Sequence, residues 1–251
     1  MLWLRHRFRE DIEGLEEVTK RLRHLVLLPG FMCDKDLWTD MVPGLGALGT
    51  IHYGNVYEDS TLDGMALRVL ASSPERFVLV GFSMGGFVAR VLALMASERV
   101  TGVAFIASSA RGYSDEEIAR RKAGYQPGDR PPRAAGEIPI ARGLRPDREN
   151  DPMLIDRLRA MQRRLGREVR KRQAALVRRD GYADLEHIAC PSLVVACRQD
   201  RLRSLAESER MAQHLPHARF AILEDCGHMA PLERPHELTA LLADWFEEAR
   251  L

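Results

Sequence analysis

The sequence predicts an α/β fold, with a mostly parallel sheet and helices on both of its faces. Two observations support this. Short apolar segments alternate with amphipathic segments along most of the chain, which is the pattern of strands joined by crossover helices. The 251 residues are 45% hydrophobic, enough to bury a sizeable core in a single domain.

Six segments are expected to form strands because they are short and apolar and lead into Gly, Pro or polar residues. They are 24–28, 50–56, 77–80, 100–106, 190–197 and 219–223.

Apolar residues at helical spacing predict the helices between these strands. The expected helical regions are 37–42, 62–70 with Ser60 or Thr61 as the cap, 88–95, 205–215 and a final helix opened by Pro235.

Residues 111–186 interrupt the alternation. They contain no strong strand pattern; 124–152 are rich in Pro, Gly and Arg and are expected to be loops, and 154–176 are expected to form one or two amphipathic helices. We interpret 111–186 as a helical insertion, and 24–110 with 187–251 as the core. Residues 1–23 are read as an N-terminal extension, either a short amphipathic helix or a loose segment.

Composition narrows the function classes. Charged residues make up 29% of the chain and the formal net charge is +1, so there is no global signal for nucleic acid binding. The four cysteines form no C-x-x-C pair and no zinc-ligand spacing, and nothing suggests a disulfide framework. No apolar stretch has the length of about 18 residues that a membrane span needs, and the N-terminus lacks the apolar core of a signal peptide. A cytoplasmic protein is expected.

The strand at 77–80 leads into Gly81-Phe82-Ser83-Met84-Gly85, a G-x-S-x-G pattern, and a helix follows. Glycines are expected here because a serine held on a tight strand-to-helix turn leaves no room for side chains two positions away. The pattern alone is also compatible with an ordinary turn. With a strand before it and a helix after it, Ser83 is predicted to be a nucleophile, with the backbone N–H of Met84 beside any oxyanion that forms.

Asp200 and His228 follow two later strands, so that Ser, Asp and His occur in the order typical of a triad on an α/β sheet. The carboxyl ends of parallel strands meet at one edge, where His228 could act as a base and Asp200 could orient it. Asp225 is the alternative acid. Phe31, after Pro29-Gly30, is expected to supply the second oxyanion donor.

These residues resemble those of the α/β-hydrolase superfamily. The matching motifs are 27–31, 81–86, Asp200 after 193–195, and 226–235. The resemblance implies an eight-stranded, mostly parallel sheet, a cap formed by the insertion, and no metal or organic cofactor. It assigns nucleophile, acid and base to Ser83, Asp200 and His228, and the oxyanion donors to Phe31 and Met84. The sequence departs from many members at Pro29, where they have His, and at Cys197, where they have Gly.

The insertion is strongly basic. Residues 111–180 contain 19 Arg and Lys against 11 Asp and Glu. One interpretation is a solvated helix face; the other is a docking surface, including Arg159, Arg163 and Arg167, for an acidic partner such as an acyl carrier protein. In layout the chain is similar to the esterases of biotin synthesis, which cleave a methyl ester on such a carrier.

The sequence therefore predicts a serine carboxylesterase that acts on a small or medium acyl ester through an acyl-enzyme, as a monomer or homodimer. Cleavage of carrier-linked methyl esters, amide or peptide hydrolysis, lactone opening, C–C cleavage and perhydrolysis remain open, because a fold does not determine its substrate. A non-catalytic ligand receptor on the same fold is the alternative from another class.

Overall fold

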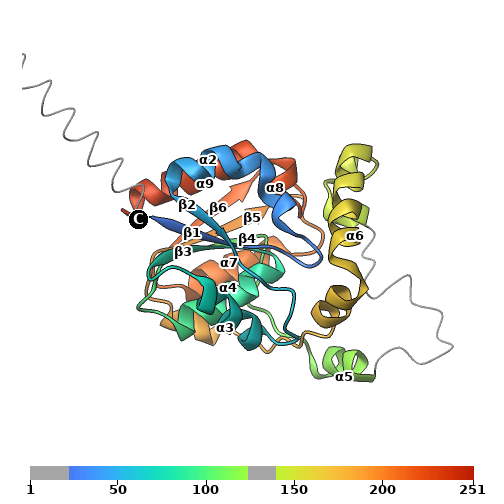
Figure 1. Ribbon diagram of the computed structural model, residues 1–251, viewed down its shortest axis with the longest axis horizontal. Coiled ribbons are helices and arrows are strands. Elements are labelled where there is room, and N and C mark those ends of the chain that lie inside the picture. The colour runs from blue at the N-terminus through green and yellow to red at the C-terminus, as the bar shows by residue number, and fades with distance from the viewer. Residues whose placement is uncertain (1–22, 124–139) are drawn as a thin grey trace, which may run out of the picture.

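The computed structural model describes residues 23–123 and 140–251, and in this part the chain forms one parallel sheet covered on both faces by helices (Figure 1). The strand order is β2-β1-β3-β4-β5-β6, and every neighbouring pair is parallel. The strands are β1 (His24–Leu28), β2 (Thr50–Tyr53), β3 (Phe77–Phe82), β4 (Val100–Ile106), β5 (Ser192–Cys197) and β6 (Ala218–Leu223).

All six segments expected to be strands are strands, but the count of eight that the resemblance implied is not confirmed. The described residues contain six strands. The described parts of the chain between β4 and β5 form helices and turns, and residues 1–22, including most of the expected N-terminal extension, lie outside the described residues. Within the described chain, only these six segments have the short apolar pattern of a buried strand.

Two apolar cores lie on opposite faces of the sheet. One is covered by η1 (Lys35–Met41), α2 (Val42–Leu48), α8 (Ala230–Glu233) and α9 (Pro235–Glu248). The other is covered by α3 (Leu62–Ser72), α4 (Met84–Met95) and α7 (Leu205–His214). Because both faces are covered, the central strands are buried throughout, which explains why β3 and β5 read as continuous apolar runs.

Local signals set several helix ends. Thr61, one of the two expected caps, accepts a hydrogen bond from the Gly64 amide and begins α3. Pro235 opens α9 as expected. The helix expected around 37–42 is divided into η1 and α2.

The described residues of the expected insertion form α5 (Asp115–Ala123), η2 (Ile140–Gly143), η3 (Pro146–Arg148), α6 (Pro152–Ala174) and η4 (Ala183–His187). The expected loops at 124–139 lie outside the described residues. α6 is one element interrupted at Gly166, whose φ is 75°. Figure 1 shows α6, in yellow, standing beside the sheet. Among the residues that the structure describes, no helix combines the length and the apolar character needed to cross a membrane.

Candidate active site

Ser83 occupies the sharp turn between β3 and α4. Its φ is 50°, in the left-handed region that a residue with a side chain rarely adopts. The turn is held in place by two hydrogen bonds: the Ser83 amide donates to the Ile106 carbonyl at 2.9 Å, and the Ser108 hydroxyl donates to the Ser83 carbonyl at 2.8 Å. A strained backbone that its surroundings hold in this way is typical of functional sites.

Glycine is required next to this turn because backbone segments approach closely. A Cβ on Gly85 would lie 2.1 Å from the Leu28 carbonyl oxygen at the end of β1. A Cβ on Gly30 would lie 2.9 Å from the Phe82 ring and 3.3 Å from the Ser83 Cβ. The loop that follows β1 is therefore packed directly against the serine turn.

The structure brings Ser83, His228 and Asp200 into one hydrogen-bonded chain. His228 Nε2 lies 2.8 Å from Ser83 Oγ, and His228 Nδ1 lies 2.7 Å from Asp200 Oδ2. The side chains of His228 and Asp200 are only 6% and 1% exposed. Because a carboxylate only accepts hydrogen bonds, Nδ1 carries the hydrogen and Nε2 is left to accept the Ser83 proton.

The carboxylate of Asp200 is held in one orientation. Its Oδ1 accepts hydrogen bonds from the amides of Leu202 at 2.7 Å and Arg203 at 3.0 Å, while Oδ2 faces His228. Each oxygen therefore has its own partners, and rotation of the carboxylate would break these hydrogen bonds.

Asp225, the alternative acid, lies elsewhere. Its side chain is 63% exposed and forms ion pairs with Arg145 at 3.5 Å and Arg234 at 3.4 Å. Of the two aspartates considered, the structure places Asp200 beside His228.

The two expected oxyanion donors, Phe31 and Met84, belong to the loop after β1 and to the start of α4. Met84 is the first residue of α4, and the first amides of a helix have no partner within it. Phe31 follows Gly30, where an added Cβ would lie 3.3 Å from the Ser83 Cβ. The backbone amides of Phe31 and Met84 are thus carried by the two segments that meet at the serine.

Sequence reasoning missed several polar residues that support this cluster. Glu233 is 8% exposed, and its Oε1 accepts a hydrogen bond from the Arg145 amide at 2.8 Å. Burial raises the pKa of Glu233, while nearby backbone amides and Arg148 act in the opposite direction. Glu233 lies within the 226–235 motif, so its position in that motif is the signal that could have found it. Ser108 has no such signal.

Cysteines near the site are packing residues. Cys33 and Cys226 are buried within the same apolar core. Burial, with a smaller effect of the Asp34 charge, raises the pKa of Cys33 to about 12, so its thiol stays protonated at neutral pH.

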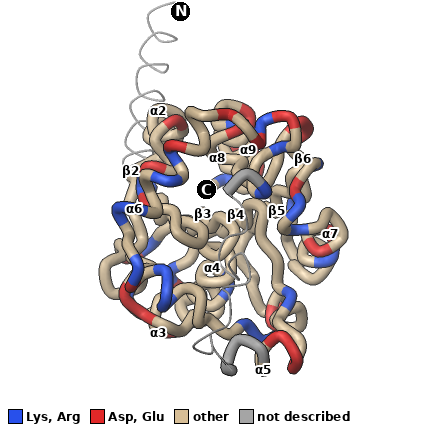
Figure 2. The backbone as a smooth tube through the Cα atoms, turned by 90° about the vertical axis from the view of Figure 1, so that its right-hand side faces the viewer, with Lys and Arg blue, Asp and Glu red and all other residues tan. Residues whose placement is uncertain are grey.

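Arg159, Arg163 and Arg167 all lie on the exposed surface of α6. Arg159 is 58% exposed and lies 3.6 Å from Asp156, one helical turn away. Figure 2, which turns this side of the molecule toward the viewer, shows Lys and Arg along α6. The structure therefore presents the three arginines to solvent, whereas Ser83 and His228 are buried.

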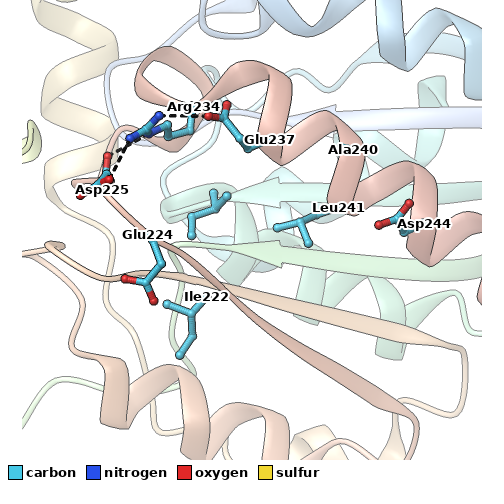
Figure 3. A pocket seen from close by; sticks show the side chains of 9 residues that line it. Ile222, Glu224, Asp225, Arg234, Glu237, Ala240, Leu241 and Asp244 are labelled. Carbon is cyan, nitrogen blue, oxygen red and sulfur yellow. Dashed lines mark hydrogen bonds and ion pairs between the residues drawn. The ribbon is translucent and has the colours of Figure 1, made fainter.

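A separate hollow of about 470 Å³ lies between β6 and α9. Figure 3 shows Arg234 pairing with Asp225 and Glu237 at its rim, and Leu241 pointing into it. Ser83 and His228 do not line this hollow, so it is distinct from the candidate active site.

Sequence comparison identifies the family. The profile of the alpha/beta hydrolase family matches residues 25–241, most of the chain. The chain belongs to the alpha/beta hydrolase family. Membership accounts for the position of Ser83 at a strand-to-helix turn and for the parallel sheet beneath it.

Relatives of this alpha/beta hydrolase include esterases. Over 95 residues the chain is 40% identical to a pimeloyl-[acyl-carrier protein] methyl ester esterase of Edwardsiella ictaluri, an alignment covering 35% of this chain and only 37% of that relative. An esterase of the same name from Aromatoleum aromaticum is 27% identical over 250 residues, covering 88% of this chain and 96% of its own. A thermophilic esterase from Thermogutta terrifontis has a similar structure, with a TM-score of 0.79 and 25% identity over 92% of each chain.

Proposed function

We propose that this alpha/beta hydrolase cleaves a carboxylic ester through a serine acyl-enzyme. The observation that carries the proposal is the contact of His228 Nε2 with Ser83 Oγ at 2.8 Å, backed by Asp200 at 2.7 Å. A serine hydroxyl is a weak nucleophile, and a base within hydrogen-bond distance is what activates it.

In the acylation step, Ser83 Oγ attacks the ester carbonyl carbon while His228 Nε2 takes the hydroxyl proton. The carbonyl oxygen becomes an oxyanion that accepts hydrogen bonds from the amides of Phe31 and Met84. Asp200 stabilises the imidazolium. When the C–O bond breaks, His228 returns the proton to the leaving alkoxide, which departs as an alcohol and leaves the acyl group on Ser83.

Deacylation repeats these roles with water in place of the serine. The water oxygen attacks the acyl carbon while His228 Nε2 takes a proton from that water. Ser83 Oγ then leaves the acyl carbon and recovers its proton from His228. The carboxylic acid is released. The nucleophile, the base, the acid and the oxyanion donors of these steps all belong to the chain.

The test compares wild type, Ser83→Ala and the matched Ser60→Ala, which changes an exposed serine remote in sequence from the cluster, on p-nitrophenyl esters from acetate to decanoate. We expect Ser83→Ala to lose more than about 1000-fold in kcat and Ser60→Ala to match the wild type. Retained activity in Ser83→Ala would refute the mechanism. A wild type that neither cleaves any ester nor reacts with a fluorophosphonate at Ser83 would favour the receptor alternative. Parallel assays on amides, lactones and C–C substrates test the other reactions.

A second candidate is an esterase for methyl esters carried by an acyl carrier protein. Two observations favour it: Arg159, Arg163 and Arg167 are solvent-exposed on α6, and relatives are named for this activity. Exposed arginines attract an acidic partner and speed its encounter with the enzyme.

Replacing these three arginines with Glu tests this candidate. We expect kcat/KM on a carrier-linked methyl ester to fall about 10- to 100-fold at low salt, with no change on the free methyl ester. An equal effect on both substrates, or on neither, would exclude docking by this surface.

A further inference from the structure

The loop that follows β1 holds an unfavourable backbone conformation close to Ser83. We call residues 29–36 the oxyanion loop. Met32 in this loop has a φ of 54° and is 1% exposed. A non-glycine residue adopts left-handed φ only when its surroundings stabilise it. Because Met32 shares a peptide unit with Phe31, whatever holds Met32 also sets the backbone next to the proposed oxyanion donor.

The partner of Met32 comes from α6. The Met32 amide donates to Gln173 Oε1 at 2.9 Å, across 141 positions of sequence. Gln173 Nε2 in turn donates to the Val56 carbonyl at 3.1 Å, in the loop after β2. The side-chain amide of Gln173 therefore joins two core loops, and Gln173 is only 3% exposed.

Charged contacts attach the same helix to the same loops. Arg164 pairs with Asp34 at 2.7 Å and with Asp36 at 3.0 Å. Arg172 Nε donates to the Tyr57 carbonyl at 2.9 Å. α6 is therefore attached to the oxyanion loop on both sides of Gly166, by Arg157 and Arg164 before it and by Gln173 after it.

The buried amide of Gln173 has a role that an apolar residue could not fill. Burying a polar side chain is unfavourable unless its donor and acceptor are both used. Both are used here, and both partners are backbone groups of core loops that flank the sheet edge.

We propose that Gln173 is a positioning residue for the oxyanion hole: it orients the Phe31–Met32 backbone from α6, so that the insertion completes the catalytic site. This inference rests on the proposed function, because it needs the Phe31 amide to be an oxyanion donor. Gln173 acts through Met32 and need not touch the substrate.

The test uses Gln173→Leu, which keeps an apolar filling but removes both hydrogen bonds. Gln162→Leu is the matched control, since Gln162 is on the same helix and its amide oxygen accepts from Arg170, within α6. We expect Gln173→Leu to lose about 10- to 100-fold in kcat on p-nitrophenyl butyrate, less than or comparable to the loss of a whole oxyanion donor, with KM within about twofold. Affinity for an alkylboronic acid, whose tetrahedral adduct uses the oxyanion hole, should fall in parallel. Gln162→Leu should match the wild type in both measurements.

Gln173→Glu separates positioning from folding. A protonated Glu presents a carbonyl oxygen to Met32 and an O–H to Val56, as Gln does, whereas an ionised Glu repels the Val56 carbonyl. The ratio of variant to wild-type kcat should therefore rise as the pH is lowered from about 8 to about 5.5. If Gln173→Leu fails to fold, the pH dependence of this ratio alone tests the positioning role of Gln173.

Three results would overturn the inference: wild-type kcat in a folded Gln173→Leu, a change confined to KM, or a Gln173→Glu ratio that does not vary with pH. Ser83→Ala is measured alongside them. If Ser83→Ala is inactive and Gln173→Leu is normal, only this inference fails. If Ser83→Ala is active, the proposed function itself fails.

Discussion

Replacing Asp200 with Asn exchanges one carboxylate oxygen for an NH₂ group and tests how the carboxylate controls the tautomer of His228. Oδ1 of Asp200 accepts from two backbone amides, those of Leu202 and Arg203. In Asp200→Asn the amide oxygen must keep this position, because the opposite orientation would place an NH₂ against two N–H groups. The NH₂ of Asn therefore faces His228 Nδ1.

This orientation forces His228 into the wrong tautomer. Facing an NH₂ donor, Nδ1 must become an acceptor, so the hydrogen of the neutral imidazole moves to Nε2. Nε2 lies 2.8 Å from Ser83 Oγ and then donates to it instead of accepting its proton. With the base blocked in this way, we expect kcat to fall about 10⁴-fold, which corresponds to about 5 kcal/mol in activation free energy. The fold should persist, because Asn has nearly the same shape as Asp and retains the two amide contacts.

The assay is hydrolysis of p-nitrophenyl butyrate, with thermal unfolding measured on the same samples. Asp225→Asn is the matched control: Asp225 is exposed and has a φ of 49°, which Asn tolerates well. We expect this control to retain kcat within about twofold, since a surface substitution of this kind has little effect. Asp200→Asn with kcat within about tenfold of the wild type, or a larger loss in Asp225→Asn, would refute the reasoning.

Three further changes probe the surroundings of the site. Gly85→Ala, whose Cβ would meet the Leu28 carbonyl at 2.1 Å, should lose activity and about 3 kcal/mol of unfolding free energy in urea; near-wild-type stability would contradict the packing described. Ser108→Ala removes the 2.8 Å hydrogen bond to the Ser83 carbonyl and should lower stability by about 1 kcal/mol in thermal unfolding; no change would mean that this bond contributes nothing. Burial raises the pKa of Glu233, so the wild type binds a proton as the pH falls through that pKa and should gain stability relative to Glu233→Gln between about pH 8 and about pH 5. Parallel pH profiles for the two proteins would contradict the raised pKa.

The six strands and the Ser83, Asp200 and His228 cluster could be predicted because their signals are local. Each strand is a short apolar run, Ser83 directly follows β3, and Asp200 and His228 lie three and five positions after the ends of β5 and β6. Parallel strands then bring the three side chains to one edge without any knowledge of long-range contacts. The strand count of eight came from the resemblance, and the described chain provides six.

The contacts of Gln173 and Glu233 could not be predicted, because no strand-end pattern like that of Ser83, Asp200 and His228 indicates their partners. Gln173 meets Met32 across 141 positions, and Glu233 meets Arg145 across 88. Gln173 lies four positions after Val169 and three before Leu176, so the helical repeat places it on the apolar side of the segment, but nothing in the sequence indicates that its partner is Met32. The left-handed φ of Met32 could not be predicted either, because the position is not occupied by glycine, the residue that usually indicates this conformation.

The arginines of α6 are another case in which the sequence does not indicate the partners of a side chain. In the sequence they form one basic cluster, and each of the two interpretations, a solvated face or a docking surface, applies to the whole cluster. The structure divides them by partner: Arg157 and Arg164 pair with aspartates that follow β1, although the Arg164 side chain is still 49% exposed, while Arg159 pairs within α6 and Arg163 and Arg167 are exposed. The helical repeat explains the division, because 157 and 164 are seven positions apart and share a face. The net charge of the insertion therefore overstates what is available to a partner, since part of it is neutralised in holding α6 against the oxyanion loop. We therefore expect an acidic partner to dock on Arg159, Arg163 and Arg167, and we expect substitutions at Arg157 and Arg164 to disturb catalysis on every substrate alike.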